Sequence, residues 1–286
     1  MRRIAIIVNC GKANASAVIR RAETCAGQLG LELYTCDQTS TLLPSSIKVT
    51  PAEIPCLVDA VLAIGGDGTL LHAARTLNGA DIPIIGVNLG SLGFMTSVPE
   101  ENLEKTMDAL RRDNVEPSRR TMLDCVLQHG GEEMERWTAL NDIVVGWGSS
   151  SRIITLDIAV DGQNVTRTMC DGLIVSTPTG STGHSMSAGG PIVHPETPAF
   201  LITIICPHTL SNRPLIISDT NPVDVTVSSA EKSLLLAIDG QDRYQINQGD
   251  CIHIEKADTS LQLLHLPEYR YFDILKHKLH WSGSVV

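Results

Sequence analysis

The chain has 286 residues with 22 basic and 32 acidic side chains, which give a formal net charge of −10, and it contains only three Trp, four Tyr and three Phe. A chain of this length can bury about three quarters of the surface that its unfolded form exposes, so it needs neither disulfides nor a structural metal to fold. The acidic balance argues against a nucleic-acid partner, because proteins that bind the phosphate backbone carry a surplus of Lys and Arg.

The cysteines and the apolar segments predict in which cellular compartment the protein works. None of the eight cysteines forms a Cys-x-x-Cys pair, so we expect them to be small buried residues in a reducing compartment. The apolar run near the start covers only residues 4–8 and no cleavage site follows it, which predicts a strand rather than a signal peptide. No apolar stretch approaches the roughly 20 residues that span a bilayer, so we expect a soluble, cytoplasmic protein without a membrane partner.

The first third of the chain alternates short apolar runs with segments of helical periodicity. The predicted strands are residues 4–8, 32–35, 58–64 and 83–87, and the predicted helices are residues 14–29, 70–77 and 101–112. Gly30 follows the first helix in the manner of a C-terminal cap. This alternation is typical of βαβ units, and it predicts an α/β domain over residues 1–116 with a Rossmann-like parallel sheet.

The residue pattern changes near residues 115–120, where short β-branched runs separated by turns replace the helical periodicity. The predicted strands are residues 122–128, 137–145, 153–160, 173–176, 201–206, 223–227 and 234–238, with a hairpin turn at residues 161–162. We therefore expect a β-rich, sandwich-like domain over residues 117–268. Residues 269–286 form a C-terminal tail with a helix over 269–279, which we expect to pack back on the first domain.

The sharpest local motif is GGDGT at residues 65–69, where a buried strand ends and a helix begins. The glycines let the backbone turn tightly and approach a ligand, and free N–H groups at a helix start favour phosphate oxygens. A carboxylate beside phosphate would be repelled unless it held a cation or accepted a proton from an attacking hydroxyl, and both tasks belong to phosphoryl transfer. The alternative is a β-turn in which Asp67 only caps the helix.

A second motif covers residues 171–191, where a strand leads into about fourteen residues dominated by Gly, Ser and Thr. Small residues allow the backbone to approach an extended ligand, and hydroxyls supply hydrogen bonds, so we interpret the segment as a binding loop. The alternative is a long surface loop without function, which is uncommon. Neither a Walker A sequence nor a G-x-G-x-x-G fingerprint after the first strand is present, so an ordinary P-loop or dehydrogenase site is unsupported.

Two shorter segments accompany these motifs. Asn141 and Asp142 lie beside a predicted buried strand, where they could bind hydroxyls or a base edge, although a plain turn is equally compatible. The segment at residues 88–93 follows the next parallel strand after the one that carries Asp67. Ligands of open α/β sheets bind at the carboxyl ends of the strands, so we expect this segment and Asp67 at one edge.

Together these motifs, in this order and followed by Pro207-His208, Arg213-Pro214 and Asp239-Gly240-Gln241, closely resemble the NAD kinase family over about residues 4–245. The GGDGT motif is shared with lipid kinases and phosphofructokinases, whereas the long Gly/Ser/Thr stretch is highly specific. The resemblance implies phosphorylation of the 2′-hydroxyl of the adenosine ribose of NAD, with ATP and Mg²⁺ or another divalent cation, to give NADP.

The resemblance also implies roles for individual residues. Asp67 matches the proton acceptor of the family, and no metal ligand of the protein can be assigned. The residues that match positions in contact with NAD are Asp67, Gly68, His72, Asn141, Asp142, Arg152, Asp171, Thr182, Gly183, His184, Ser185, Met186, Ser187 and Gln241. Homo-oligomers, dimers or tetramers, are common in the family and are expected here by analogy.

The chain departs from the family pattern at two places. Asn141-Asp142 stands where the family usually has Asn-Glu, and Thr182-Gly183-His184 stands where it usually has Thr-Ala-Tyr. A histidine can stack on a base but offers less area than a tyrosine and titrates near neutrality. Two alternatives remain open: a lipid kinase of the diacylglycerol or sphingoid type, which would need an apolar acceptor channel, and a non-catalytic sensor that binds NAD(H).

Overall fold

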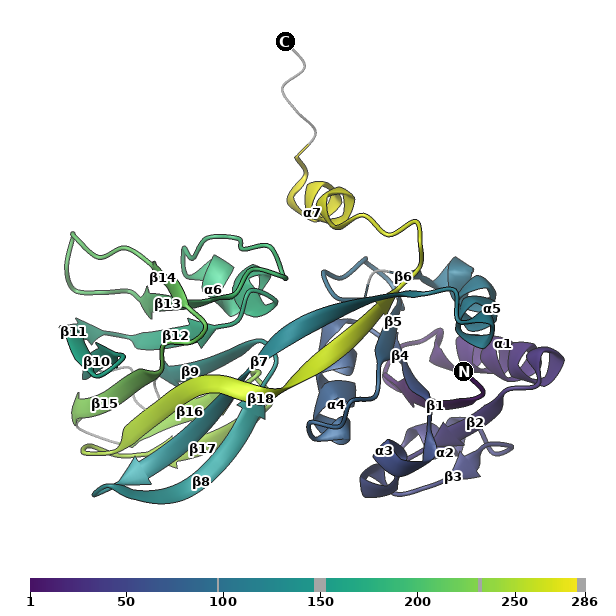
Figure 1. Cartoon of the computed structure of the whole chain (residues 1–286), viewed down its shortest axis with the longest axis horizontal. Helices are drawn as coiled ribbons and strands as arrows, with labels where there is room; N and C mark the ends of the chain where they lie inside the picture. Colours follow the sequence, from purple (N-terminus) through teal and green to yellow (C-terminus); the bar gives the residue numbers. More distant parts are fainter. Residues whose placement is uncertain (97, 147–152, 231–232, 282–286) are drawn as a thin grey trace, which may run out of the picture. The chain divides into compact units, whose positions relative to one another are not determined.

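The computed structural model describes residues 1–96, 98–146, 153–230 and 233–281 (Figure 1). Its contacts divide the chain into two compact units, unit 1 with residues 1–119 and 261–286 and unit 2 with residues 120–260. Two strands, β7 (Glu116–His129) and β18 (Cys251–His265), carry the chain from one unit to the other. The domain limits expected from the sequence, after residues 116 and 268, stay predictions.

Unit 1 is built on a parallel sheet with the strand order β3-β2-β1-β4-β5, and β6 and the end of β18 also pair with β5 in parallel. Its strands are β1 (Arg3–Val8), β2 (Glu32–Thr35), β3 (Ile47–Lys48), β4 (Ala60–Gly65), β5 (Ile84–Asn88) and β6 (Val98–Pro99). The central strands β1, β4 and β5 are buried along nearly their whole length, as expected for strands covered on both faces. This confirms the predicted α/β class of the N-terminal part.

Helices cover both faces of this sheet. They are α1 (Ala15–Leu29), α2 (Thr39–Leu42), α3 (Ile54–Leu57), α4 (Asp67–Leu77) and α5 (Leu103–Arg112), with 3-10 turns η1 (Pro51–Glu53) and η2 (Glu100–Asn102), and a further helix of unit 1, α7 (Tyr271–Leu279), follows β18. α1 and α5 share one apolar cluster with alternate strand residues such as Ile6 and Leu62. On the other face a Cβ at Gly86 would lie 3.1 Å from the Leu70 side chain, so α4 packs closely over β5 there. Gly30 ends α1 with φ of 64°, as predicted.

Unit 2 is an antiparallel sandwich, which confirms the predicted β-rich class of the C-terminal part. One sheet has the order β11-β10-β15-β18 and the other β14-β13-β12-β9-β16-β17. The further strands are β8 (Glu132–Ala139), β9 (Asp142–Gly146), β10 (Ile154–Val160), β11 (Gln163–Cys170), β12 (Gly172–Ser176), β13 (Ala199–Ile205), β14 (Leu215–Ser218), β15 (Val223–Ser229), β16 (Leu234–Ile238) and β17 (Asp242–Ile246). Ile158 and Val225 of the first sheet share a core with Val175 and Phe200 of the second.

Several elements differ from the sequence prediction. The single strand expected over residues 137–145 is wrong, because the chain turns at residues 140–141 and forms two strands, β8 and β9. The hairpin turn predicted at residues 161–162 is confirmed, since β10 and β11 pair antiparallel across it, although the bounds of β11 were not predicted. The strands β14, β17 and β18 and the short elements between β2 and β4 were not predicted. Helix α4 begins at Asp67, three residues before the predicted start.

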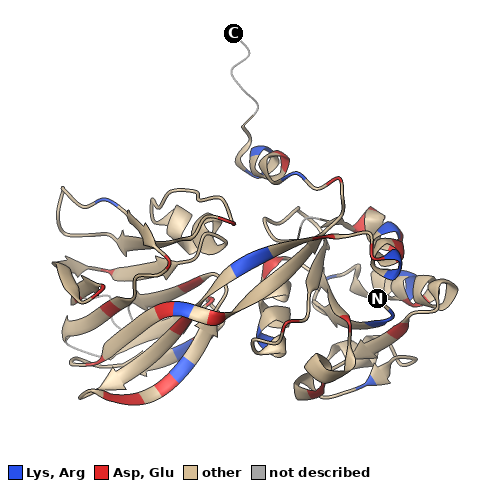
Figure 2. Ribbon diagram, viewed as in Figure 1, with Lys and Arg blue, Asp and Glu red and all other residues tan. Residues whose placement is uncertain are grey.

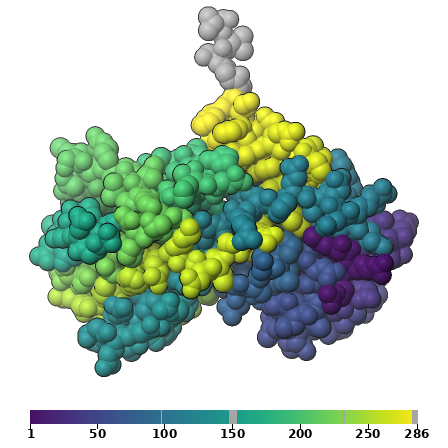
Figure 3. All heavy atoms as spheres, viewed as in Figure 1, coloured from purple at the N-terminus to yellow at the C-terminus, as the bar shows by residue number. Residues whose placement is uncertain are grey.

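The surface is acidic in character but locally mixed. Figure 2 shows basic and acidic residues alternating along β8 and β18, and Arg136 lies within 4 Å of carboxylates of Asp124, Glu133 and Glu255. On unit 1 the segment between β18 and α7 lies against α5 (Figure 3), where Lys105 forms an ion pair with Glu268. Among the helices in the described part of the chain, none is long and apolar enough to cross a membrane.

Candidate active site

The GGDGT motif forms the turn between β4 and α4 in unit 1. Gly65 ends the strand, and a Cβ there would lie 2.2 Å from Thr69 Oγ1, so the helix can start this close to the strand only if the residue is glycine. Asp67 is the first residue of α4 and is half-buried. A Cβ at Gly68 would meet no atom within 4 Å, so the space beside this exposed glycine is open to a ligand.

The Asp67 carboxylate is bound to the loop that follows β5. Oδ1 accepts hydrogen bonds from the backbone N–H groups of Met95 (3.1 Å) and Thr96 (2.9 Å) and from the Thr96 hydroxyl (3.0 Å), and Oδ2 accepts one from the N–H of Phe94 (2.9 Å). A Cβ at Gly93 would lie 2.1 Å from Oδ1, which explains the glycine there. The two motifs therefore meet at one sheet edge, and Oδ2 keeps acceptor capacity that Oδ1 has used.

A pocket of about 420 Å³ lies at this edge, all within unit 1. It is lined by Val8, Asn9, Lys12, Gly66, Gly68, Thr69 and His72. His72 is exposed and reaches the pocket from the next turn of α4, so the structure brings Gly68 and His72 to one cavity. Asn9 and Lys12 were not among the predicted site residues, although their position shortly after the first parallel strand was a signal for this edge.

In unit 2 Asn141 of the predicted pair lies in the turn between β8 and β9, and Asp142 is the first residue of β9. Asp142 is 5% exposed, and burial together with the negative charge of Asp239 raises the pKa of its carboxyl group to about 7. The side-chain oxygen of Asn141 is buried without a hydrogen-bond partner. Buried polar atoms are nearly always partnered in folded proteins, so an unpartnered one here favours a site completed by a ligand.

The Gly/Ser/Thr loop after β12 packs against this turn. It contains η3 (Gly180–Thr182) and the short helix α6 (His184–Ser187). A Cβ at Gly180 would lie 2.2 Å from the carbonyl oxygen of Asn141, so only glycine allows this contact. A Cβ at Gly183 would lie 3.9 Å from Asp142 Oδ2 and 4.0 Å from Asn141 Nδ2, which places Gly183 beside both predicted side chains.

The remaining predicted residues differ in exposure. Ser185 is fully buried, and its hydroxyl lies 2.9 Å from that of Thr203 on β13, so it anchors the loop to that strand. Thr182 and Met186 are half-buried, and His184, Ser187 and Gln241 are exposed. Their contacts with NAD stay predictions.

Asp171 lies between β11 and β12, half-buried, and Arg152 lies outside the described residues. The carboxylate of Asp171 forms a hydrogen bond with the exposed thiol of Cys206, and this bond raises the pKa of the thiol. Two supporting residues were not singled out from the sequence, namely Thr177 and Asp239, both of which bind the backbone of the turn at 140–142. In the sequence, Asp239 stood out only as the first residue of the Asp239-Gly240-Gln241 motif, with no role assigned to it.

Comparison with known proteins identifies the chain. The family model described as the ATP-NAD kinase N-terminal domain matches residues 4–115, and the model of the C-terminal domain matches residues 140–266. The NAD kinase of Syntrophotalea carbinolica is 38% identical over 283 residues, covering 99% of both chains, and that of Trichlorobacter lovleyi is 43% identical over 235 residues, covering 82% of both.

Solved structures agree with these matches. The yeast NADH kinase complexed with NADH superposes with a TM-score of 0.92 at 25% identity, covering 100% of this chain and 89% of that chain. An NAD kinase from Archaeoglobus fulgidus in complex with ATP gives a TM-score of 0.78 at 27% identity, covering 98% and 100%. With its motifs, its two-unit fold and both family domains in place, this chain belongs to the NAD kinase family and is an enzyme that phosphorylates NAD.

Proposed function

We propose that the enzyme transfers the γ-phosphoryl group of ATP to the 2′-hydroxyl of the adenosine ribose of NAD, with Asp67 as proton acceptor and Mg²⁺ as the cation. The observation that carries this proposal is the position of Asp67, which begins α4 at the carboxyl edge of the sheet and keeps acceptor capacity on Oδ2. A hydroxyl that donates to Oδ2 would be aligned for attack and could lose its proton to the carboxylate. The similar structures with NADH and ATP support substrates of these two classes.

The 420 Å³ pocket is the place we assign to the phosphates of the donor. The positive end of the α4 dipole and the ammonium group of Lys12 both favour anionic oxygens. Positioning and electrostatic stabilisation account for most of the catalysis of phosphoryl transfer, so a preorganised pocket of this kind is suited to the reaction.

Among the described residues, no cluster of three or more His, Cys, Asp or Glu side chains could hold a metal ion. We propose a Mg²⁺ ion that binds mainly to substrate phosphates and water, since such sites need only one or two carboxylates. The ion supplies neutralisation of the phosphate charge, and we assign no protein ligand to it.

The donor and the cation are tested by following NADP formation from NAD. We expect activity with ATP and Mg²⁺, its loss in excess EDTA, and its recovery when Mg²⁺ is restored. Lys12→Ala should raise KM for ATP by about tenfold, the scale of one lost hydrogen bond to a charged group, and leave KM for NAD unchanged. Lys48→Ala, an exposed lysine on β3, is the matched control.

Activity that survives EDTA, or a polyphosphate donor used in preference to ATP, would contradict this assignment. NAD binding in calorimetry without any NADP would favour the sensor alternative.

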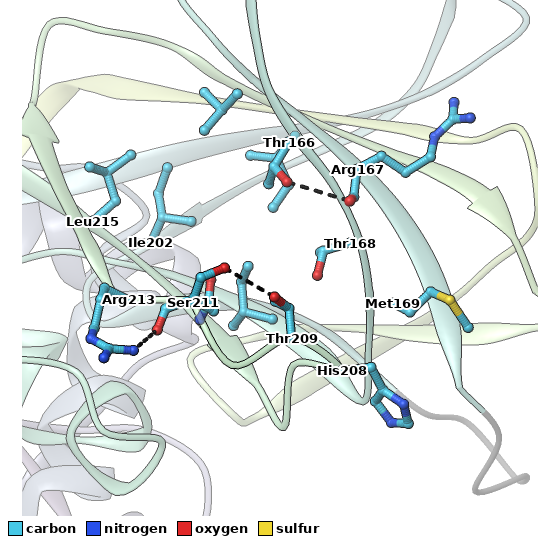
Figure 4. A pocket seen from close by; sticks show the side chains of 14 residues that line it. Thr166, Arg167, Thr168, Met169, Ile202, His208, Thr209, Ser211, Arg213 and Leu215 are labelled. Atoms are coloured by element: carbon cyan, nitrogen blue, oxygen red, sulfur yellow. Dashed lines mark hydrogen bonds between the residues drawn. The ribbon is translucent and has the colours of Figure 1, made fainter.

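We also infer a homo-oligomer. In unit 2 exposed apolar residues lie on β11, β14 and the loop between β13 and β14, namely Val165, Met169, Leu210, Leu215 and Ile216, and three of them, Val165, Met169 and Leu215, line one pocket. These elements surround a pocket of about 640 Å³ (Figure 4), into which Thr166 and Thr168 point while Arg213 bonds to carbonyls of its own loop. Exposed apolar patches of this kind often mark sites where proteins associate, and sedimentation velocity measures the oligomeric state directly.

Localisation in the cytoplasm also stays a prediction.

A further inference from the structure

The turn that carries Asn141 and Asp142 is held by a carboxylate from a distant part of the chain. Asp239, in the turn between β16 and β17, accepts hydrogen bonds from three consecutive backbone N–H groups. Its Oδ2 lies 2.9 Å from the nitrogen of Leu140, and its Oδ1 lies 2.6 Å from that of Asn141 and 3.1 Å from that of Asp142. In return, the N–H of Asp239 donates to the carbonyl oxygen of Asp142 at 2.9 Å.

Thr177 binds the same turn through its carbonyl groups. Its hydroxyl donates to the carbonyl oxygen of Leu140 at 2.6 Å, and its N–H donates to that of Asn141 at 2.9 Å. The hydroxyl also accepts the N–H of Gly180 at 3.1 Å, so the Gly/Ser/Thr loop is tied to the same point. Asp239 and Thr177 thus satisfy the N–H and C=O groups of the turn from two sides.

This arrangement leaves the side chains of the turn available. The backbone of Asn141 is fully bonded, yet its side-chain oxygen is buried and unpartnered. The carboxyl group of Asp142 is nearly as buried. Side chains held in this way on a fixed backbone are preorganised for a ligand, since little freedom is lost when the ligand binds.

We propose that Asp239, with Thr177, is a positioning residue for NAD, whose ribose hydroxyls and base edge Asn141 and Asp142 bind. The inference rests on the proposed function of that pair. Asp239 acts through the turn and makes no contact with substrate in this account, so its removal should misplace Asn141 and Asp142 without touching the transferred phosphoryl group.

Asp239 has a second effect on the pair through its charge. Within unit 2 the charge that acts on Asp142 is that of Asp239, while Ser176 of the neighbouring β12, Thr177 directly after it and Gly183 of the loop are all uncharged. If the carboxylate form of Asp142 accepts ribose hydroxyls, KM for NAD should rise as pH falls below about 7.

Two variants separate position from charge. Asp239→Asn keeps one acceptor oxygen but turns an N–H₂ group toward a backbone N–H, and Thr177→Val removes the hydroxyl while the charge of Asp239 stays. Both should raise KM for NAD by about 10–100-fold, the effect of misplacing a binding group by about 1 Å, with KM for ATP unchanged. Only Asp239→Asn should shift the acid limb of the pH profile to lower pH, because it alone lowers the pKa of Asp142.

The controls are Thr177→Ser, which keeps the hydroxyl and should match the parent enzyme, and Asp250→Asn. Asp250 is another buried carboxylate in unit 2 that accepts a backbone N–H, from Asn247 at 2.7 Å. Its substitution should leave KM for NAD unchanged.

The outcomes are distinguishable. An unchanged KM for NAD in Asp239→Asn and Thr177→Val, with an active parent enzyme, overturns the inference alone, whereas an inactive parent that binds no NAD overturns the proposed function. If Asp239→Asn fails to fold, the Thr177→Val and Thr177→Ser pair decides. One test uses the parent enzyme alone. If its KM for NAD does not change with pH across neutrality, the proposed role of the Asp142 carboxylate beside Asp239 is contradicted.

Discussion

Replacing Asp67 with Asn is expected to lower turnover by about 10²–10⁴-fold, which is the usual contribution of a positioned general base. The asparagine cannot accept the proton of the ribose hydroxyl, and its amide offers a donor where Oδ2 offered an acceptor. Steady-state NADP formation with saturating NAD and ATP measures the effect as a loss of kcat.

The structure adds a second consequence that the motif did not reveal. Asp67 also holds the loop at residues 93–96 through four hydrogen bonds, and the variant can keep only those to Oδ1. We therefore expect a loss of about 1–3 kcal/mol in the free energy of unfolding, from the N–H of Phe94 left facing a donor.

Thr96→Val is the matched control for this double role. It removes one hydrogen bond between the loop and Asp67, at a fully buried position of similar shape, and leaves the carboxylate intact. If Thr96→Val loses activity as severely as Asp67→Asn, Asp67 acts through the loop and its role as proton acceptor is wrong.

Replacing Asp142 with Asn is expected to stabilise the fold at pH 8 and weaken NAD binding. Burial and the charge of Asp239 raise the pKa of Asp142 to about 7 in the folded protein, well above that of the unfolded chain. A raised pKa favours the neutral form, so this group contributes stability below about pH 4 that is lost as pH rises through 7. Asparagine stays neutral, so the variant should gain a few kcal/mol in the free energy of unfolding at pH 8.

The measurement is urea unfolding at pH 5 and pH 8, together with calorimetry of NAD binding. The stability gain should shrink toward pH 5, while the loss of an anionic acceptor should weaken NAD binding by about 10–100-fold at pH 8. Asp250→Asn provides the contrast, because its buried carboxylate is bonded to His129 and Asn247 and its loss should destabilise the fold. A variant of Asp142 that is less stable than the parent at pH 8 would contradict the account.

The sequence predicted those elements whose residues are buried on a regular period. β1, β4 and β5 are covered on both faces and appear in the sequence as continuous apolar runs, so their positions can be predicted from the local sequence alone. The edge strands β14 and β17 are largely exposed, and β18 has a polar middle at residues 255–260, so none carries a clear apolar period. Such strands are defined by their partners across the sheet.

The candidate site shows the same division. Glycines and carboxylates marked both motifs, because close backbone approach and phosphoryl chemistry each need particular residue types. The polar pair Asn141-Asp142 left a turn open within residues 137–145, but the sequence could not show what fixes it, because the turn is bound by Asp239, almost a hundred residues away. The bonds between Asp67 and the loop after β5 likewise depend on parallel strands meeting at one edge.

The most direct test of the central claim follows a labelled γ-phosphate of ATP into NAD in the presence of Mg²⁺. The account predicts that the label appears in a product that an NADP-specific dehydrogenase reduces, which places the phosphate on the 2′-hydroxyl of the adenosine ribose. Label that stays in ATP or free phosphate, or that enters a product the dehydrogenase does not accept, would contradict it.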